Sequence, residues 1–199
     1  MKVTTGSRTR SLEAILVLPL FFLGIGGHTP VAMGQSTGTF TATGEMTTPR
    51  FSHTATLLLD GRVLIAGGIN SYVNNAAVVL ASAELYDPSR GTFSAIGNMT
   101  RARARHTATL LADGRVLIAG GSRDRPRSAE LYDPSTGTFT TTVDMTTDGG
   151  PATLLPDGRV LIAGESSAEI YDPVTGTFAT TGTYAAAGAA RVFTNYAAC

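Results

Sequence analysis

The sequence of 199 residues has one cysteine, no long hydrophobic run and no net charge. Because Cys199 has no second thiol to pair with, an intramolecular disulfide is excluded. From Gln35 onward, 12 Arg stand against 9 Asp and 5 Glu, so this part carries a charge near −2. That balance excludes a general affinity for nucleic acid.

The longest apolar stretch, residues 14–25, is interrupted by Pro19 and Gly24 and is shorter than the roughly 20 residues that span a bilayer. It follows Lys2, Arg8 and Arg10 and precedes the small residues 32–34. This order predicts a secretory signal peptide over residues 1–34, cleaved before Gln35, rather than a membrane anchor. We therefore expect a secreted, periplasmic or cell-surface protein without a stable membrane span.

Several catalytic patterns are also missing: G-x-S-x-G, a phosphate-binding loop, and G-x-G-x-x-G after a strand. After the signal peptide the only histidines are His53 and His106, which occupy the same position of a repeated unit. Equivalent positions on packed sheets lie about 10 Å apart, whereas zinc needs three or four ligands within about 2.3 Å. We expect no catalytic residue, no metal site and no cofactor, and a hydrogen-bonded structural role for both histidines.

What the sequence does have is a repeated unit, most complete in residues 106–139. Two apolar runs, residues 107–111 and 115–119, flank Asp113-Gly114, a pair typical of tight hairpin turns. A third run, residues 129–132, is joined to a fourth by Asp-Pro-Ser-Thr-Gly, which is a turn sequence. The unit therefore predicts a four-stranded antiparallel meander, with strands a, b, c and d in that order.

The unit occurs three times, with its Asp-Gly turns at Asp60, Asp113 and Asp157. Four-stranded units at spacings of 53 and 44 residues are typical of a β-propeller. We predict blades at about residues 50–97, 103–143 and 150–182. Because residues 36–46 repeat the sequence of strand d, we also predict an orphan N-terminal strand at residues 38–43.

The repeated motifs resemble those of kelch repeats across residues 38–178. The resemblance rests on the glycines that end strand b and on the Glu and Tyr of strand c: Gly67, Gly68, Glu84, Tyr86, Gly120, Gly121, Glu130, Tyr132, Gly164, Glu169 and Tyr171. It implies an all-β, kelch-type propeller. The chain departs from the family in having Phe for the strand d aromatic, often Trp in kelch blades, and in replacing the third double glycine with Gly164-Glu165.

Three blades are fewer than the four to eight that close a propeller, so the sequence predicts an incomplete or open ring. A truncated or frameshifted propeller, a ring completed by several copies, and an open arc capped by an irregular alanine-rich tail at residues 184–199 all remain open. Apolar end faces are expected to be interfaces or aggregation sites.

Polar residues that recur in every unit are interpreted as structural, because a catalytic acid is normally needed once. This applies to the strand c glutamates and to Arg62, Arg115 and Arg159 after the Asp-Gly turns. The strand c tyrosines and strand d phenylalanines are expected to pack blade against blade.

In such a meander the a–b and c–d turns share one face, and the b–c loops and d–a links share the other. The second face varies in length and carries the candidate ligand-binding residues, namely Asn70, Tyr72, Asn74, Arg101, Arg103, Arg105, Arg123, Arg125 and Arg127. Since alternate residues of an extended segment point the same way, Arg101, Arg103 and Arg105 are expected to form one row. The planar guanidinium groups of arginine can bind carboxylate, sulfate or phosphate groups. The alternative is that these arginines belong to an ordinary solvated surface.

The sequence thus favours a non-enzymatic scaffold that binds a protein or glycan ligand through the b–c loop face. Some kelch proteins that this chain resembles in blade sequence are enzymes, namely copper-radical sugar oxidases and sialic acid epimerases. The oxidase chemistry needs a tyrosine–cysteine crosslink and histidine ligands to copper, and no residues of this sequence match that set. A fragment of such an enzyme and a self-assembling surface or adhesion module are the alternatives. A homo-oligomer that completes the ring is a further expectation.

Overall fold

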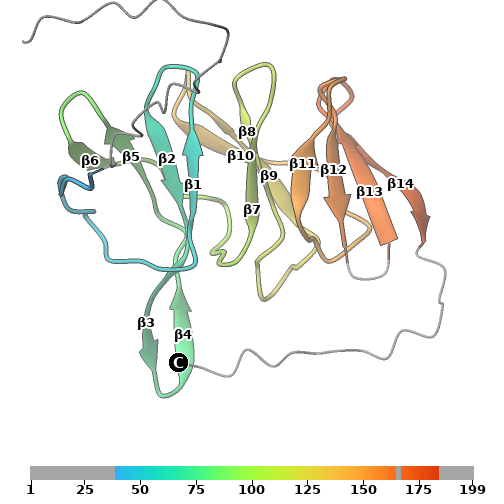
Figure 1. The fold of residues 1–199 in the computed structure, drawn as a ribbon. Coiled ribbons are helices and arrows are strands. Elements are labelled where there is room, and N and C mark those ends of the chain that lie inside the picture. Colours follow the sequence, from blue (N-terminus) through green and yellow to red (C-terminus); the bar gives the residue numbers. More distant parts are fainter. Residues whose placement is uncertain (1–38, 165–166, 184–199) are drawn as a thin grey trace, which may run out of the picture. The chain divides into compact units, whose positions relative to one another are not determined.

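The computed structural model describes residues 39–164 and 167–183, and the strands in them belong to one unit, Thr41–Cys199. They form three four-stranded antiparallel sheets and one two-stranded hairpin (Figure 1). This confirms the predicted all-β fold with three antiparallel blades. The described residues contain no helix with the length and apolarity needed to cross a membrane.

Each blade is a meander whose strands follow the predicted order. The first consists of β1 (Thr54–Leu57), β2 (Val63–Ala66), β5 (Ala83–Asp87) and β6 (Thr92–Ala95). The second consists of β7 (Thr107–Leu110), β8 (Val116–Ala119), β9 (Ala129–Asp133) and β10 (Thr138–Thr141). The third consists of β11 (Ala152–Leu154), β12 (Val160–Ala163), β13 (Ser167–Asp172) and β14 (Thr177–Thr183).

The hydrophobic cores lie between neighbouring blades rather than within one. Leu64 and Ala66 of β2 share a buried cluster with Val116 and Ile118 of β8. Because side chains alternate along a strand, Leu117 of β8 points the other way, into a second cluster with the third blade. In the second blade, strand b (β8) is therefore covered on both of its faces.

The double glycine that ends strand b allows the d–a link to cross it closely. Gly121 has a φ of 71°, and a Cβ there would lie 2.5 Å from the carbonyl oxygen of Ala104. At the equivalent position in the first blade, a Cβ on Gly68 would lie 2.7 Å from the carbonyl oxygen of Phe51, in the link that enters that blade. Only a residue without a side chain fits this approach.

Turns and loops separate to opposite edges of the blades, as Figure 1 shows. The first b–c loop, residues 69–82, contains a hairpin that the sequence reading missed, formed by β3 (Ile69–Val73) and β4 (Ala76–Val79). Its turn residues Asn74 and Asn75 have φ of 48° and 62°, the left-handed pair of a type I′ turn. The hairpin projects from the edge that carries the b–c loops.

The predicted orphan strand is not formed in the part of its range that the structure describes, because residues 39–43 are irregular. Thr43 Oγ1 lies 2.7 Å from the hydroxyl of Tyr86 in strand c, and the Gly44 N–H donates to the carbonyl of Gly91 in the c–d turn. The segment therefore contacts the first blade without pairing with it as a strand. The predicted signal peptide and alanine-rich tail lie outside the described residues.

Candidate functional site

Each strand c glutamate is buried and binds the d–a link that enters its own blade. Glu84 accepts hydrogen bonds from the backbone N–H groups of Thr47 and Thr48 at 2.7 and 3.1 Å, and Glu130 accepts one from Thr100 at 2.7 Å. Burial alone would raise the pKa of Glu84, but the bonds from Thr47, Arg50 and Thr48 outweigh it and hold the pKa below its usual value. These bonds tie each entering link to its own blade.

Arg103 belongs to this buried network, which corrects its prediction as a ligand-binding residue. Its side chain is fully buried, and its Nε donates to Glu130 at 2.6 Å. Its Nη1 donates to the carbonyls of Gly120 and Ser128. Arg50 does the same in the first blade with Glu84, so the predicted row of three exposed arginines does not exist.

In the third blade, the buried carboxylate of Glu169 has its hydrogen-bond donors without an arginine. Its d–a link is two residues shorter, since Met145 precedes Asp157 by 12 residues whereas Met99 precedes Asp113 by 14. The hydroxyls of Thr146 and Thr147 donate to Glu169 in place of the guanidinium, together with both backbone N–H groups.

Two of the three strand c tyrosines pack between described blades, as expected, and each strand c tyrosine also lies in tilted contact with the phenylalanine of its own blade. Tyr132 and Tyr171 are fully buried against the preceding blade. Tyr132 lies 4.8 Å from Phe139 between ring centroids, and Tyr171 lies at the same distance from Phe178.

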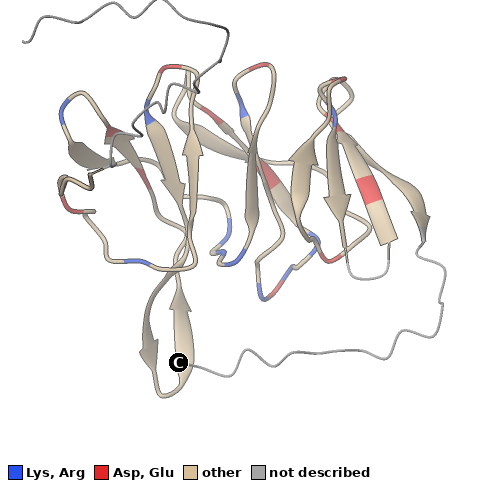
Figure 2. Ribbon diagram, viewed as in Figure 1, with Lys and Arg blue, Asp and Glu red and all other residues tan. Residues whose placement is uncertain are grey.

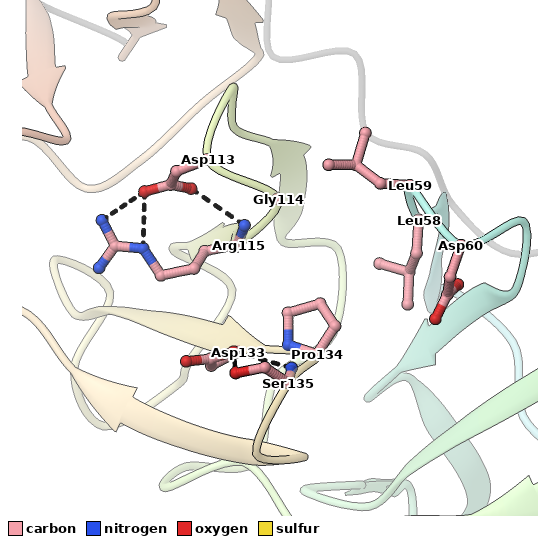
Figure 3. A pocket seen from close by; sticks show the side chains of 9 residues that line it. All are labelled: Leu58, Leu59, Asp60, Asp113, Gly114, Arg115, Asp133, Pro134 and Ser135. Carbon is pink, nitrogen blue, oxygen red and sulfur yellow. Dashed lines mark hydrogen bonds and ion pairs between the residues drawn. The ribbon is translucent and has the colours of Figure 1, made fainter.

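A pocket of about 350 Å³ opens on the turn face between the first two blades (Figure 3). Its charged groups already have hydrogen-bond partners: Asp113 accepts from the Arg115 guanidinium at 2.6 Å, Asp133 accepts from the N–H and hydroxyl of Ser135, and Asp60 pairs with Arg62. Burial acts to raise the pKa of Asp113, but Arg115 lowers it below its usual value overall. The pocket therefore offers a ligand few free polar groups.

The two histidines do not form a metal site with any third ligand in the described segments. Among residues 39–164 and 167–183, no three His, Cys, Asp or Glu side chains lie close enough to hold a metal ion. His106 is 6% exposed, and its Nε2 lies 2.9 Å from Thr54 Oγ1. Burial lowers the pKa of His106 to about 4, with the charge of Arg103 as a smaller cause.

The arrangement best suited to binding is a cleft beside the β3–β4 hairpin, which we call the hairpin cleft. It consists of two hollows of about 230 and 380 Å³ that share Ala77, Val79 and Arg123. The smaller is completed by Ile69, Tyr72, Ala104, Arg105 and Gly121, and the larger by Thr100, Arg101, Ala102, Ser122 and Asp124. The cleft thus lies between the hairpin, the second d–a link and the second b–c loop.

Three of the predicted arginines, Arg101, Arg105 and Arg123, line this cleft. None of them forms a salt bridge with another described residue. Arg125 and Arg127, by contrast, pair with Asp144 and Asp148 at 3.6 and 2.8 Å. Figure 2 shows basic positions along the edge that carries the links and b–c loops, and others near the turns of the opposite edge.

The backbone directs Arg105 towards the cleft. The Arg103 N–H donates to the carbonyl of Leu80, and the Arg105 N–H donates to that of Ser52, so the link is held at the base of the hairpin. Arg105 has a φ of 57°, a left-handed conformation that is unfavourable for a side chain of this kind. Ser52 has a φ of 55° at the equivalent position of the first link, so the left-handed residue is a repeated feature of these links.

The remaining predicted residues have different roles. Tyr72 is 57% exposed, lines the cleft, and lies 6.0 Å from the ring of Phe51. The Asn70 amide donates to the carbonyl of Pro49 and so anchors the hairpin, while Asn74 forms its turn. Ala77 and Val79 were not predicted as site residues, because only the hairpin brings them to the cleft.

Comparison with known proteins agrees with the architecture of the blades. A solved structure described as a novel fungal alcohol oxidase with catalytic diversity among the AA5 family, in complex with copper, is 22% identical, with a TM-score of 0.56. The match covers 68% of this chain and 31% of that one, so this chain spans about a third of its length, and the likeness shows the propeller fold alone. Residues 50–100 match the Kelch motif family, and a search among curated proteins gives no match. The blades are those of a β-propeller, and the part of the chain that contains the first blade, residues 50–100, matches the Kelch motif.

Proposed function

We propose that this protein is a non-enzymatic recognition scaffold, acting outside the cytoplasm, which binds an acidic protein segment or glycan in the hairpin cleft. The observation that supports this most directly is that three arginines without a salt-bridge partner among the described residues line a cleft beside exposed Tyr72. Arginine forks bind carboxylates in a bidentate manner, and Tyr and Arg are enriched where binding energy concentrates. The basic N-terminal segment and the apolar run that follows support the location.

The arginines of the cleft have a feature that distinguishes them from structural ones. Arg101 stands where the first link has Thr48, and Arg105 stands where it has Ser52. The fold is built without arginine at these positions in the first blade, so the positive charge is not needed for folding there. This favours a role in binding.

The test is calorimetric titration with a glutamate-rich peptide and, separately, an oligosaccharide of uronic acids. Binding of either is expected to weaken with salt, and Arg101→Ala, Arg105→Ala and Arg123→Ala should each reduce affinity about tenfold, or 1.4 kcal/mol. Arg90→Ala is the matched control, because Arg90 is 78% exposed and pairs with Asp87 on the turn face. Affinity that all three cleft variants retain would contradict the proposal.

The enzymatic alternative can be tested on the same preparation, because the similar solved structure is an alcohol oxidase in complex with copper. We expect no oxidation of primary alcohols or sugars when copper is added to the purified chain. Turnover above the background of free copper would overturn the non-enzymatic part of the proposal.

A further inference from the structure

The two junctions between neighbouring blades are built from the same repeat positions. One side of each is formed by strand b leucine and alanine, namely Leu64 and Ala66, then Leu117 and Ala119. The other side is formed by the valine, isoleucine and tyrosine of the next blade, namely Val116, Ile118 and Tyr132, then Val160, Ile162 and Tyr171. All these residues are 2% exposed or less.

The third blade has the first half of a junction. No described residue packs against it in the way that the next blade does at the other two junctions. Leu161 and Leu155 are the equivalents of Leu117 and Leu111. Both are partly exposed, whereas Leu117 and Leu111 are each 1% exposed. The apolar face that binds a following blade is therefore present and open.

The first blade has the second half. Val63 and Tyr86 are partly exposed, whereas their equivalents Val116 and Tyr132 are fully buried; Ile65, the equivalent of Ile118, is 6% exposed. Met46 precedes this blade as Met99 precedes the second, and Met99 is buried in a junction while Met46 is half-buried. The first blade also has a complete buried network around Glu84, so its entering link is already formed.

We propose that the open face of the third blade binds the first blade of a second copy, so that two chains close a ring of six blades. The contact continues the two junctions already present within the chain, position for position. The three blades that the structure describes are too few to close a propeller, whereas those of two copies make six, which lies within the four to eight that close. Each copy supplies one half of each junction, so the two junctions are identical by symmetry and both of the open faces described above are covered.

The experiment is light scattering during size exclusion of the purified chain. We expect one species of twice the chain mass. Leu161→Asp should shift it to the mass of one chain, because a carboxylate would be placed in an apolar junction. The control Leu59→Asp places the same charge on a leucine that is 73% exposed on the turn face, and should leave the dimer intact.

A mixture of two variants excludes the objection that Leu161→Asp is merely misfolded. Val63→Asp should also give the mass of one chain, but the two variants mixed together retain one unaltered junction. Their mixture should therefore associate, although each alone does not. A single-chain mass or a polydisperse aggregate for the unsubstituted chain would overturn the proposal, as would a mixture that fails to associate.

Discussion

At the scale of residues, the buried carboxylates of strands c have the largest energetic consequences. Burying an ion is costly unless its hydrogen bonds are satisfied, and removing one partner of a buried pair costs about 3–5 kcal/mol. We expect Arg103→Ala to lower the free energy of unfolding by about that amount, because Glu130 would keep only the bond from Thr100 among its described partners. Urea denaturation followed by circular dichroism measures it.

Arg101→Ala is the control for that measurement, because Arg101 lies two residues away but lines the cleft. Its effect on stability should be within about 0.5 kcal/mol. The pair Arg103→Met with Glu130→Gln should lose less than Arg103→Ala, since it leaves no buried charge. Equal losses in all three variants would mean that the buried ion pair is not the cause.

His106 predicts a dependence of stability on pH. Its pKa is about 4 in the folded protein and near 6.5 when unfolded, so the unfolded chain takes up the proton first as the pH falls. Stability should therefore decrease between pH 6.5 and about 4, by about 3 kcal/mol, and should not depend on this residue above that range. In urea denaturation at several pH values, His106→Gln should show a smaller decrease over the same range.

Repetition explains which arginines the sequence could assign. Arg50 and Arg103 both stand three residues before the histidine of their unit, and a recurring offset predicts a structural role. Arg101 and Arg105 have no such counterparts. The row expected from alternation was wrong because the link is not uniformly extended: it turns left-handed at Arg105.

At the scale of elements, the β3–β4 hairpin decides whether the cleft exists. Asn74 and Asn75 hold its turn in a conformation that costs about 1–2 kcal/mol for ordinary residues. We expect Asn75→Gly to increase the protection of the hairpin amides from hydrogen exchange, and Asn75→Ala to decrease it about fivefold or more. Unchanged exchange in both variants would show that the hairpin is held by its contacts with the link rather than by its turn.

The hairpin was missed because its signal is weak in the sequence. Asn-Asn is a less distinctive turn pair than Asn-Gly, and β3 contains Asn70 and Ser71, which are not typical strand residues. The blades were predictable for the opposite reason, since every Asp-Gly turn is flanked by apolar strands and the pattern recurs. Recurrence adds information that a single hairpin in one b–c loop cannot supply.

At the scale of the whole molecule, the blades should differ in local stability. In a repeat architecture each blade is stabilised by its neighbours, so an end blade with one free face opens more easily than a central one. Amides of β12 should exchange faster than those of β8 in dilute solution. If two copies close the ring, protection in β12 should rise with protein concentration while that in β8 changes little.

The fold was more predictable from the sequence than the candidate site, because the two depend on different kinds of contact. Turn chemistry and strand patterning are local, so the three blades follow from the sequence. The cleft depends on where the hairpin, the second link and the second b–c loop meet, and on which charges are used internally. Arg125 and Arg127 resemble Arg123 in sequence, yet only the fold pairs them with Asp144 and Asp148.

The hydrogen bonds of the buried glutamates also define the smallest segment of the chain that can be duplicated without separating a buried carboxylate from its donors. Every described partner of Glu84 lies between Met46 and Asn98, and every described partner of Glu130 lies between Met99 and Asp144. A duplication or deletion whose boundaries fall at these methionines carries the acid together with all its donors. A gene of this kind can therefore gain or lose whole units without leaving a charge stranded, whereas a boundary placed between a link and its strand c would do so each time.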